Sequence, residues 1–441
     1  MSAKKPFSYP SRLPPGEIRL LSLVPSSTTL SFRLITTPLF SPVPYIALSY
    51  VWGTPRTSSD ASAPTILVDG QSFIVTPNLH SALTSLLTPE LGSGLSIWVD
   101  AVCINQMDDV EKIGQIKRMD QVYRNSERVI VYLGDSPDSE TARAVQQLRR
   151  IGKKVWEADA FTLREPDMQH WPNFEHLEDQ PEERRRRVAI RDKIFKMIKQ
   201  ERGGVVLSRP RIPASAALDL FHRPWFGRAW IVQEIVIAPV HNRGNRGYVF
   251  AVGAERIKWE YLWAAHLFLC LWFITEAKAI GEAKTYVGKL IAFGVYVKRT
   301  GMLPRAFSAR AAQTLGLRKK YLQGDLGLRL KDLLLQLYVG DSGGLLGCRD
   351  PEDKVRALRG MASDGELLDK FMTPGATWED IYISLASRFY QEGDLSFLSI
   401  CRQRSPRLPS WVPDWSQQQR PPWLGYSTDS GTQLYNAGRG T

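Results

Sequence analysis

Two carboxylates, Asp100 and Glu234, occur in segments that are also rich in tryptophan, arginine and side-chain amides. Trp230 and Glu234 are four residues apart, so they share one face of a helix, and Arg228 is close to both in sequence. A carboxylate can stabilise a cationic, oxocarbenium-like transition state or bind sugar hydroxyl groups. An indole ring can stack on a planar base. These residue types therefore favour chemistry at a glycosidic bond.

Two apolar segments must position the other candidate residues. Residues 45–51 (YIALSYV) and 97–99 (IWV) have the continuous apolar character of buried strands. Ligands of an open parallel sheet bind outside the carboxyl ends of its strands. The two segments and the residues that follow them place eight candidate residues at that edge: Ser49, Tyr50, Trp52, Gly53, Asp100, Cys103, Asn105 and Gln106. We expect this edge and the helix face to form one cleft that contains Gly53, Asp100, Asn105 and Glu234.

Each candidate also has a structural interpretation, and the sequence leaves both open. Glu234 can pair with Arg228 or Arg223 inside the domain, because structural ion pairs also place acids in clefts. Asp100 can cap the turn that follows it. For Cys103 the sequence favours a small buried residue over a nucleophile. A Cys–His enzyme needs a partner histidine, and none of the six histidines lies in a comparable segment.

Apolar strands alternate with amphipathic helices in the first third of the chain. Strands are expected at residues 18–23, 30–35, 45–51, 96–99, 128–133 and 248–252, with a hairpin of 66–68 and 73–75 across Asp69-Gly70. Helices are expected after Thr76-Pro77, over 111–125, from Asp138 or Ser139 to about 151, over 221–238 from Pro224, and over 259–274. This order predicts an α/β fold: a mainly parallel central sheet flanked by helices, with a largely helical C-terminal region.

Composition shifts divide the chain further. We expect the first part of the α/β domain at 1–151, a charged insertion at 152–220, the rest of the domain at 221–275, a helical region at 276–415 and a disordered tail at 416–441. The insertion contains the consecutive arginines 184–187 directly after an acid-rich stretch. This pattern favours a solvated, self-paired segment, and the alternative is a patch that binds an anion or nucleic acid.

The bulk properties are those of a globular protein. The 441 residues are 43% hydrophobic and 23% charged, with a formal charge of +12 that is not focused. The four cysteines form no CxxC pair, so neither a disulfide framework nor a zinc or other metal site is expected. The longest apolar run, 261–274, is shorter than the roughly 20 residues that span a bilayer. No secretion signal is present at the N-terminus. We expect a cytoplasmic protein that does not bind nucleic acid.

Three long segments together resemble the heterokaryon-incompatibility (HET) domain family of filamentous fungi. They are residues 45–53 (YIALSYVWG), 97–106 (IWVDAVCINQ, continuing to 134) and 223–234 (RPWFGRAWIVQE). Residues 348–355 (CRDPEDKV) and 408–415 (LPSWVPDW) resemble the tail that often follows the domain. The resemblance spans about 18–415 and is weakest over 152–211; Ala229 departs from it, where larger or polar residues are also common. No nucleotide-binding or repeat region accompanies the domain.

The resemblance implies a role in non-self recognition, with growth arrest or cell death after incompatible cells fuse. HET domains have been likened to TIR domains, some of which cleave NAD, so the implied fold is TIR/flavodoxin-like. The W-x-x-x-E spacing of Trp230 and Glu234 also resembles a pattern in bacterial TIR-like proteins. By this resemblance NAD is a substrate and not a cofactor, with Glu234 and Asp100 as catalytic residues. The substrate would contact Tyr50, Trp52, Gly53, Cys103, Asn105, Gln106, Arg228 and Trp230.

A second hypothesis needs no turnover. The chain would then be a signalling module that acts by self-association or by recruiting an incompatibility partner protein through the same surface. The sequence contains neither GxGxxG nor GxxxxGK[ST], so a bound phosphate would have to meet backbone amides or Arg228. Nicotinamide release by the purified protein distinguishes the two hypotheses.

Overall fold

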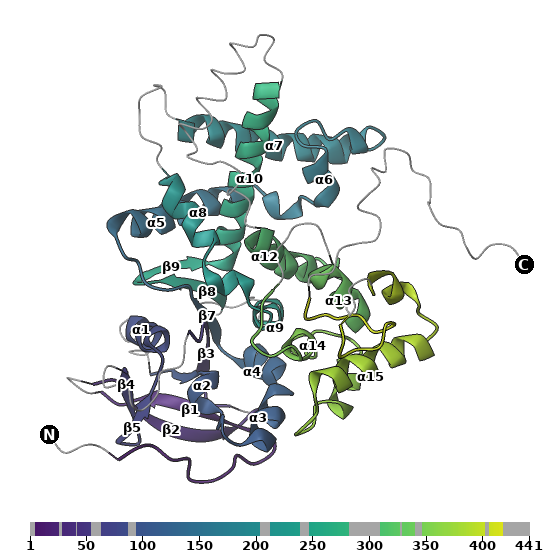
Figure 1. Cartoon of the computed structure of the whole chain (residues 1–441). Helices are drawn as coiled ribbons and strands as arrows, with labels where there is room; N and C mark the ends of the chain where they lie inside the picture. The colour runs from purple at the N-terminus through teal and green to yellow at the C-terminus, as the bar shows by residue number, and fades with distance from the viewer. Residues whose placement is uncertain are drawn as a thin grey trace, which may run out of the picture. The chain divides into compact units, whose positions relative to one another are not determined.

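The computed structural model describes residues 5–25, 29–40, 42–53, 63–86, 94–202, 212–238, 247–281, 309–326, 329–339, 346–401 and 405–417 (Figure 1). The chain divides into two compact units, residues 1–326 and 327–441. Most of the tail expected at 416–441 lies outside the described residues.

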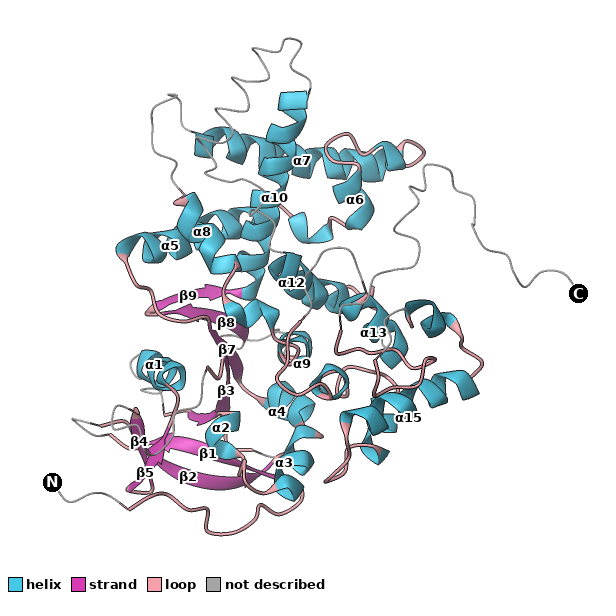
Figure 2. Ribbon diagram, in the orientation of Figure 1, coloured by secondary structure: helices cyan, strands magenta, loops and turns pink. Residues whose placement is uncertain are grey.

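One sheet of nine strands organises the described part of the first unit (Figure 2). Its strands are β1 (Glu17–Leu23), β2 (Ser31–Pro38), β3 (Tyr45–Tyr50), β4 (Thr65–Val68), β5 (Gln71–Ile74), β6 (Ser96–Trp98), β7 (Arg128–Tyr132), β8 (Gly247–Val252) and β9 (Glu255–Lys258). Their order across the sheet is β5-β4-β2-β1-β6-β3-β7-β8-β9.

The centre of the sheet is the parallel run β6-β3-β7-β8. Ala47 of β3 lies opposite Trp98 of β6 on one side and Val129 of β7 on the other. Every residue of β3 is buried, as its unbroken apolar run predicts. Segments 45–51, 97–99 and 128–133 are expected to be central strands of one sheet, and this expectation is confirmed by the positions of β3, β6 and β7.

The sheet is mixed, however, and the prediction of a mainly parallel sheet is wrong. β1 pairs antiparallel with both β2 and β6, while β4–β5 and β8–β9 are antiparallel hairpins. The short connections within β1–β2, β4–β5 and β8–β9 permit only antiparallel pairing, because a parallel neighbour needs a crossover of a dozen or more residues. The β4–β5 turn is made by Asp69 and Gly70 at φ 50° and 76°, as the Asp-Gly pair predicts.

Two helices expected to be continuous are interrupted. The helix expected over 111–125 is α3 (Asp109–Ile116) followed by α4 (Met119–Asn125), because Arg118 leaves helical geometry at φ −117° and ψ 6°. The helix expected over 221–238 is α8 (Ala214–Phe221), the 3-10 helix Pro224–Gly227 and α9 (Ile231–Ile237). Arg228 is extended, with ψ 140°, so α9 begins only after it.

Other helices follow the sequence closely. α1 (Pro77–Leu86) starts where the Thr76 hydroxyl accepts a hydrogen bond from the Leu79 amide at 3.3 Å. α5 (Ser139–Glu157) is capped by Asp138, which accepts from the Thr141 amide at 2.7 Å, but it runs beyond the expected end near residue 151. α10 (Trp259–Gly281) contains the expected buried helix and packs against α5, β8 and β9. None of the helices in the described ranges has the length and apolarity to cross a membrane.

The segment expected to be a charged insertion is largely helical. It includes α6 (Glu165–Gln169), α7 (Pro181–Arg202) and short 3-10 helices at Ala160–Thr162 and Glu175–Leu177. Trp171 is fully buried and contacts Phe195 of α7 and Thr275 of α10. The segment therefore has an apolar interior of its own, and its charges pair with one another.

The first unit includes a helix beyond residue 275. α12 (Ala309–Leu322) packs against α9 and α10. The described part of the second unit contains helices α13 (Leu330–Tyr338), α14 (Asp353–Arg356) and α15 (Trp378–Gln391), with 3-10 helices Gly365–Lys370 and Ser396–Ile400. No strand occurs among these residues.

Candidate functional site

The carboxylate of Glu234 lies inside the first unit, next to the end of β3. It is 1% exposed, and the Ser49 hydroxyl donates a hydrogen bond to its Oε2. The Trp225 indole donates in turn to Ser49 Oγ at 2.7 Å. Segment 45–53 is therefore connected to segment 223–234 by side-chain hydrogen bonds, although about 180 residues separate them in the sequence.

Arg228 completes the connection between these two segments. Its Nη1 donates to the carbonyl oxygen of Tyr50 and lies 4.0 Å from Glu234 Oε1. Its side chain remains 20% exposed, so the guanidinium reaches from the buried carboxylate towards solvent. Arg223, the other expected partner of Glu234, instead donates to the carbonyl oxygens of Leu133 and Asp135 at 3.0 and 3.1 Å.

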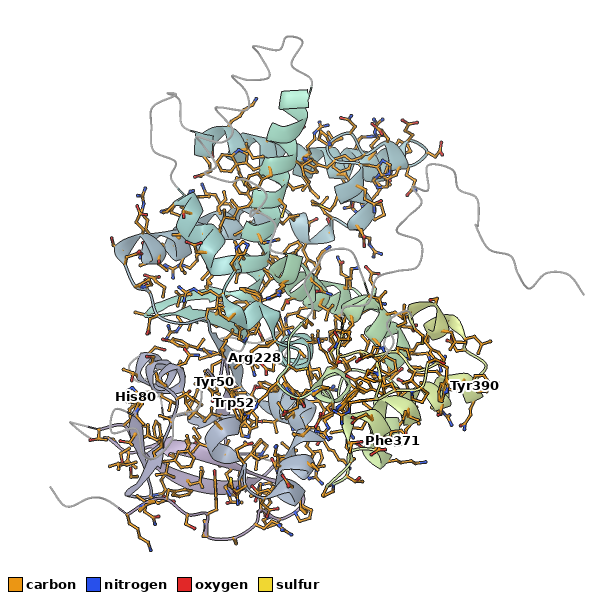
Figure 3. The ribbon with its side chains drawn as sticks, in the orientation of Figure 1. Tyr50, Trp52, His80, Arg228, Phe371 and Tyr390 are labelled. Carbon is orange, nitrogen blue, oxygen red and sulfur yellow. The ribbon has the colours of Figure 1, made fainter. Side chains whose placement is uncertain are left out.

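Asp100 follows β6 at the start of the short helix α2 (Asp100–Cys103) and is partly exposed. The Trp52 indole donates to its Oδ2 at 2.8 Å, and the Ala101 amide donates to its Oδ1 at 2.7 Å. Segment 97–106 is in this way connected to segment 45–53. Tyr50, Trp52 and Arg228 lie together in Figure 3, and with Asp100 and Glu234 we call these residues the polar cluster.

The surroundings of the cluster raise the pKa of both carboxyl groups. Burial raises the pKa of Glu234, against the opposing effects of Arg228 and the Ser49 hydrogen bond, and the nearby charge of Asp100 raises it further. Burial also raises the pKa of Asp100, although Arg228 and the Trp52 indole favour its ionised form. The Arg228 guanidinium therefore interacts with two carboxyl groups whose pKa values are raised. Such an arrangement is common at functional sites.

Tyr50 adds a polar atom without a partner to this cluster. The residue is 2% exposed, and its hydroxyl makes no hydrogen bond within the described part of the chain. Burial and the nearby Asp100 hold the pKa of the hydroxyl far above its ordinary value. A buried hydroxyl without a partner costs free energy, and functional sites are among the places where proteins accept this cost.

The remaining candidates from segment 97–106 shape the loop that follows β6. Cys103 Sγ accepts from the Val99 amide at 3.4 Å, and burial raises the pKa of its thiol to about 12, so no thiolate forms near neutral pH. Asn105 Oδ1 accepts from the Met107 amide at 3.1 Å. Gln106 donates to the carbonyl oxygen of Asp100 at 2.9 Å. These contacts hold Asp100 in place rather than add reactive groups.

Gly53 and Trp230 lie at the margins of the cluster. Gly53 is exposed and has φ 73°, a left-handed backbone conformation that favours glycine after β3. Trp230 precedes α9, and its carbonyl oxygen accepts from the Glu234 amide at 3.3 Å. The i, i+4 relation that the sequence predicts for Trp230 and Glu234 is present.

Tyr123 is a further residue of the site that no sequence pattern indicates. Tyr123 of α4 hydrogen-bonds to Glu234, and this bond lowers the pKa of the carboxyl group. In the sequence Tyr123 is one apolar position among Met119 and Val122, so nothing distinguishes it from a core residue. In the described ranges no group of three histidine, cysteine, aspartate or glutamate side chains is placed to hold a metal ion.

Comparisons with known proteins found a family model and a relative that match this part of the chain. Residues 45–234 match the family model described as Heterokaryon incompatibility protein (HET). The chain is 25% identical over 452 residues to "Heterokaryon incompatibility protein 6, OR allele" of Neurospora crassa. The alignment covers 94% of this chain and 60% of the relative, so the chain spans about three fifths of that protein's length. No solved structure matches the chain.

Proposed function

Because this chain is a heterokaryon-incompatibility (HET) domain protein, we propose that it acts in fungal non-self recognition and triggers growth arrest or cell death. The match covers segments 45–53, 97–106 and 223–234, whose side chains meet in the polar cluster. That convergence carries the proposal, because residues from three separate segments come together where the parallel strands β3 and β6 end.

For the chemistry we propose that the polar cluster hydrolyses NAD or a related nucleotide. The partly exposed residues Trp52, Asp100 and Arg228 are the ones that a ligand can reach. The Trp52 indole would stack on a planar ring, and the Arg228 guanidinium would bind phosphate oxygens. Asp100 would stabilise the positive charge that develops on the ribose. Glu234 is 1% exposed, so it would not contact the ligand itself and would instead hold the Arg228 side chain in position.

The proposed reaction balances with water alone. The bond between the nicotinamide nitrogen and the anomeric carbon of ribose breaks, and its electron pair leaves with nicotinamide. A water oxygen forms a new bond to the anomeric carbon and releases one proton to solvent. Asp100 lowers the barrier because its charge opposes that of the oxocarbenium-like transition state. Removing one such electrostatic group typically lowers the rate by about 10²–10³-fold.

Induced expression in a fungal host tests the biological part of the proposal. We expect the wild-type chain to arrest growth, and we expect Asp100→Asn and Glu234→Gln to relieve the arrest at equal protein levels. Asp109→Asn is the matched control, because Asp109 is an exposed aspartate of α3 that lies outside the cluster. Unchanged arrest in a stably folded Asp100→Asn variant would remove the cluster from the toxic mechanism.

A second candidate function is supported by the loop beside the cluster. Met107 is 93% exposed and Val110 is 52% exposed, next to the contacts of Asn105 and Gln106. Contiguous exposed apolar patches mark surfaces that bind other proteins, and we propose that these two side chains belong to such a patch. The module would then act by self-association or by recruiting an incompatibility partner, without turnover. Met107→Lys would abolish growth arrest under this candidate and would leave it intact if hydrolysis is the mechanism.

A further inference from the structure

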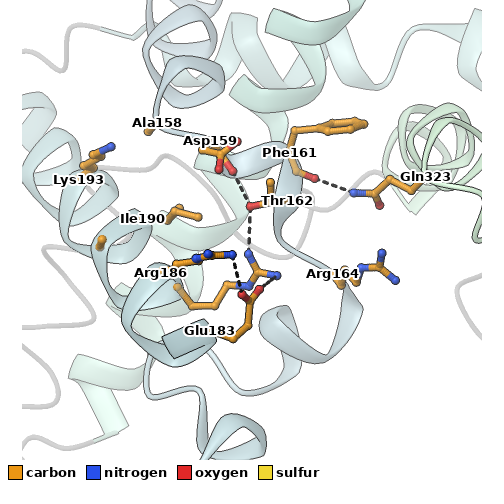
Figure 4. Close-up of a pocket in the computed structure, with 12 residues that line it drawn as sticks. Ala158, Asp159, Phe161, Thr162, Arg164, Glu183, Arg186, Ile190, Lys193 and Gln323 are labelled. Carbon is orange, nitrogen blue, oxygen red and sulfur yellow. Dashed lines mark hydrogen bonds and ion pairs between the residues drawn. The ribbon is translucent and has the colours of Figure 1, made fainter. Parts of the chain in front are cut away.

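A pocket of about 570 Å³ lies outside the polar cluster, where the segment 158–164 faces helix α7 (Figure 4). This volume is in the range of small-molecule sites. Four cations, Arg164, Arg186, Arg187 and Lys193, line it against two acids, Asp159 and Glu183. The pocket is therefore lined by residues of the arginine-rich part of the sequence. These residues do not belong to the polar cluster.

One face of α7 forms a wall of the pocket. Residues 183, 186, 187, 190 and 193 follow the three- and four-residue spacing that brings side chains to one side of a helix. Ile190 is 5% exposed and contributes an apolar surface between the charged side chains. Three cations of α7, Arg186, Arg187 and Lys193, therefore lie on the face that forms the pocket.

Arg187 pairs with Glu183 of this wall and with Asp167 of α6. Its side chain is 10% exposed, its Nη2 lies 2.6 Å from Glu183 Oε1, and its Nε lies 3.0 Å from Asp167 Oδ2. Its Nη1 also donates to Thr162 Oγ1 at 3.0 Å, and this hydrogen bond connects α7 to the segment 158–164 on the other side of the pocket. A buried, multiply bonded arginine of this kind builds the site but is not available to a ligand.

The other cations remain available. Arg186 is 75% exposed and lies 3.6 Å from Glu183, a carboxylate that Arg187 already holds. Arg164 is 58% exposed, with Asp325 at 3.2 Å. The Lys193 side chain forms neither an ion pair nor a hydrogen bond among the residues that the structure describes. Exposed ion pairs contribute little, so an anion can compete for these side chains.

We propose that this pocket binds a sugar phosphate, free or as part of a nucleotide. Arg164, Arg186 and Lys193 bind the phosphate oxygens through charge-assisted hydrogen bonds. Asp159 is exposed at the rim and accepts hydrogen bonds from sugar hydroxyl groups. The Asp159 carboxylate disfavours inorganic phosphate and pyrophosphate. These anions have no sugar hydroxyl group that could donate to it, so only the repulsion between the two negatively charged groups remains.

Calorimetry on the full chain tests this site with ribose 5-phosphate, ADP, inorganic pyrophosphate and ribose as probes. We expect saturable binding of ribose 5-phosphate or ADP, weaker binding of pyrophosphate and none of ribose. Lys193→Glu and Arg186→Glu should each weaken binding by about tenfold or more, since each removes a hydrogen bond to a charged group. Binding of ADP without ribose 5-phosphate identifies the nucleotide as the ligand.

Two further variants show whether the ligand binds in this pocket. Lys199→Glu makes the same charge change at an exposed residue on the opposite face of α7, and we expect unchanged binding. Asp100→Asn alters the polar cluster and should also leave binding unchanged. The proposal is overturned if no sugar phosphate binds, if Lys199→Glu weakens binding as much as Lys193→Glu, or if Asp100→Asn abolishes it.

Discussion

Arg19 and Glu111 form a buried ion pair that holds the loop after β6. Arg19 Nη1 and Nη2 donate to the two carboxylate oxygens at 2.6 and 2.9 Å, and both side chains are almost fully buried. Glu111 also accepts from the amides of Leu13 and Asn105 at 2.9 and 2.8 Å. Removing one member leaves the other charge buried without its partner, so Arg19→Met should cost about 3–5 kcal/mol in free energy of unfolding. Denaturant unfolding measures this cost.

The exposed pair nearby provides the control for this variant. Arg12 contacts Asp108 at 2.6 Å, but the arginine is 59% exposed, so Arg12→Met should cost no more than about 1 kcal/mol. Equal losses for Arg12→Met and Arg19→Met would contradict the importance that we assign to burial.

The Glu111 carboxyl group also predicts a dependence of stability on pH. Burial alone would raise its pKa, but the hydrogen bonds from Arg19, Asn105 and Leu13 outweigh that effect and lower it. A carboxyl group whose pKa is lower in the folded state contributes its full stabilisation above its unfolded-state pKa of about 4.3. This contribution is lost as the pH falls through the pKa of the folded state. Unfolding free energy should therefore fall on acidification below about pH 4.3. A fall that is as steep in Glu111→Gln as in the wild type would contradict this account.

At this scale the sequence predicted which residue types meet, but not how each is used. The spacing of Trp230 and Glu234 and the ends of the two strands identified most of the polar cluster. The roles of Ser49 and Tyr123 depend on contacts across more than a hundred residues, and no local pattern encodes such contacts.

At the scale of elements, the crossing of α5 and α10 depends on Gly152. A β-carbon built there would lie 1.9 Å from the carbonyl oxygen of Tyr261, so the two helix backbones are in direct contact. Gly152→Ala should therefore destabilise the fold by about 1–3 kcal/mol or more, despite the higher helix propensity of alanine. Gly114→Ala in α3 is the matched control. Its β-carbon meets only Arg118 Nη1 at 3.9 Å, so it should stabilise by about 0.5–1 kcal/mol. Thermal unfolding that shifts the same way in both variants would contradict the packing.

The elements also show where local sequence stops being informative. Apolar runs and the Asp69-Gly70 turn predicted the strands and one hairpin, because strand type and turn chemistry are local. The directions of β1 and β2 depend on which strands they pair with, and composition does not encode that choice. Arg118 and Arg228 interrupt the expected helices in segments whose apolar spacing is helical on both sides.

At the scale of the whole molecule, the division at residues 326 and 327 was not visible in composition. The sequence around 275 turns from an apolar helix to a mixed segment, which suggested a boundary there. α12 nevertheless belongs to the first unit, because the Arg318 side chain donates to the carbonyl oxygens of Ile235 and Ala238 at 2.6 and 3.0 Å. The contact between the buried Arg318 of α12 and the end of α9 is long-range in sequence, and no local property predicts it.

Nicotinamide release from NAD by the purified full chain tests the central claim most directly. We predict time-dependent release by the wild type and by Asp109→Asn, with a rate about 10²–10³-fold lower in Asp100→Asn at unchanged thermal stability. Glu234→Gln should lower the rate as well, because it removes the charge that fixes Arg228. Absence of release from concentrated wild-type protein, or an unchanged rate in Asp100→Asn, would contradict hydrolysis at the polar cluster.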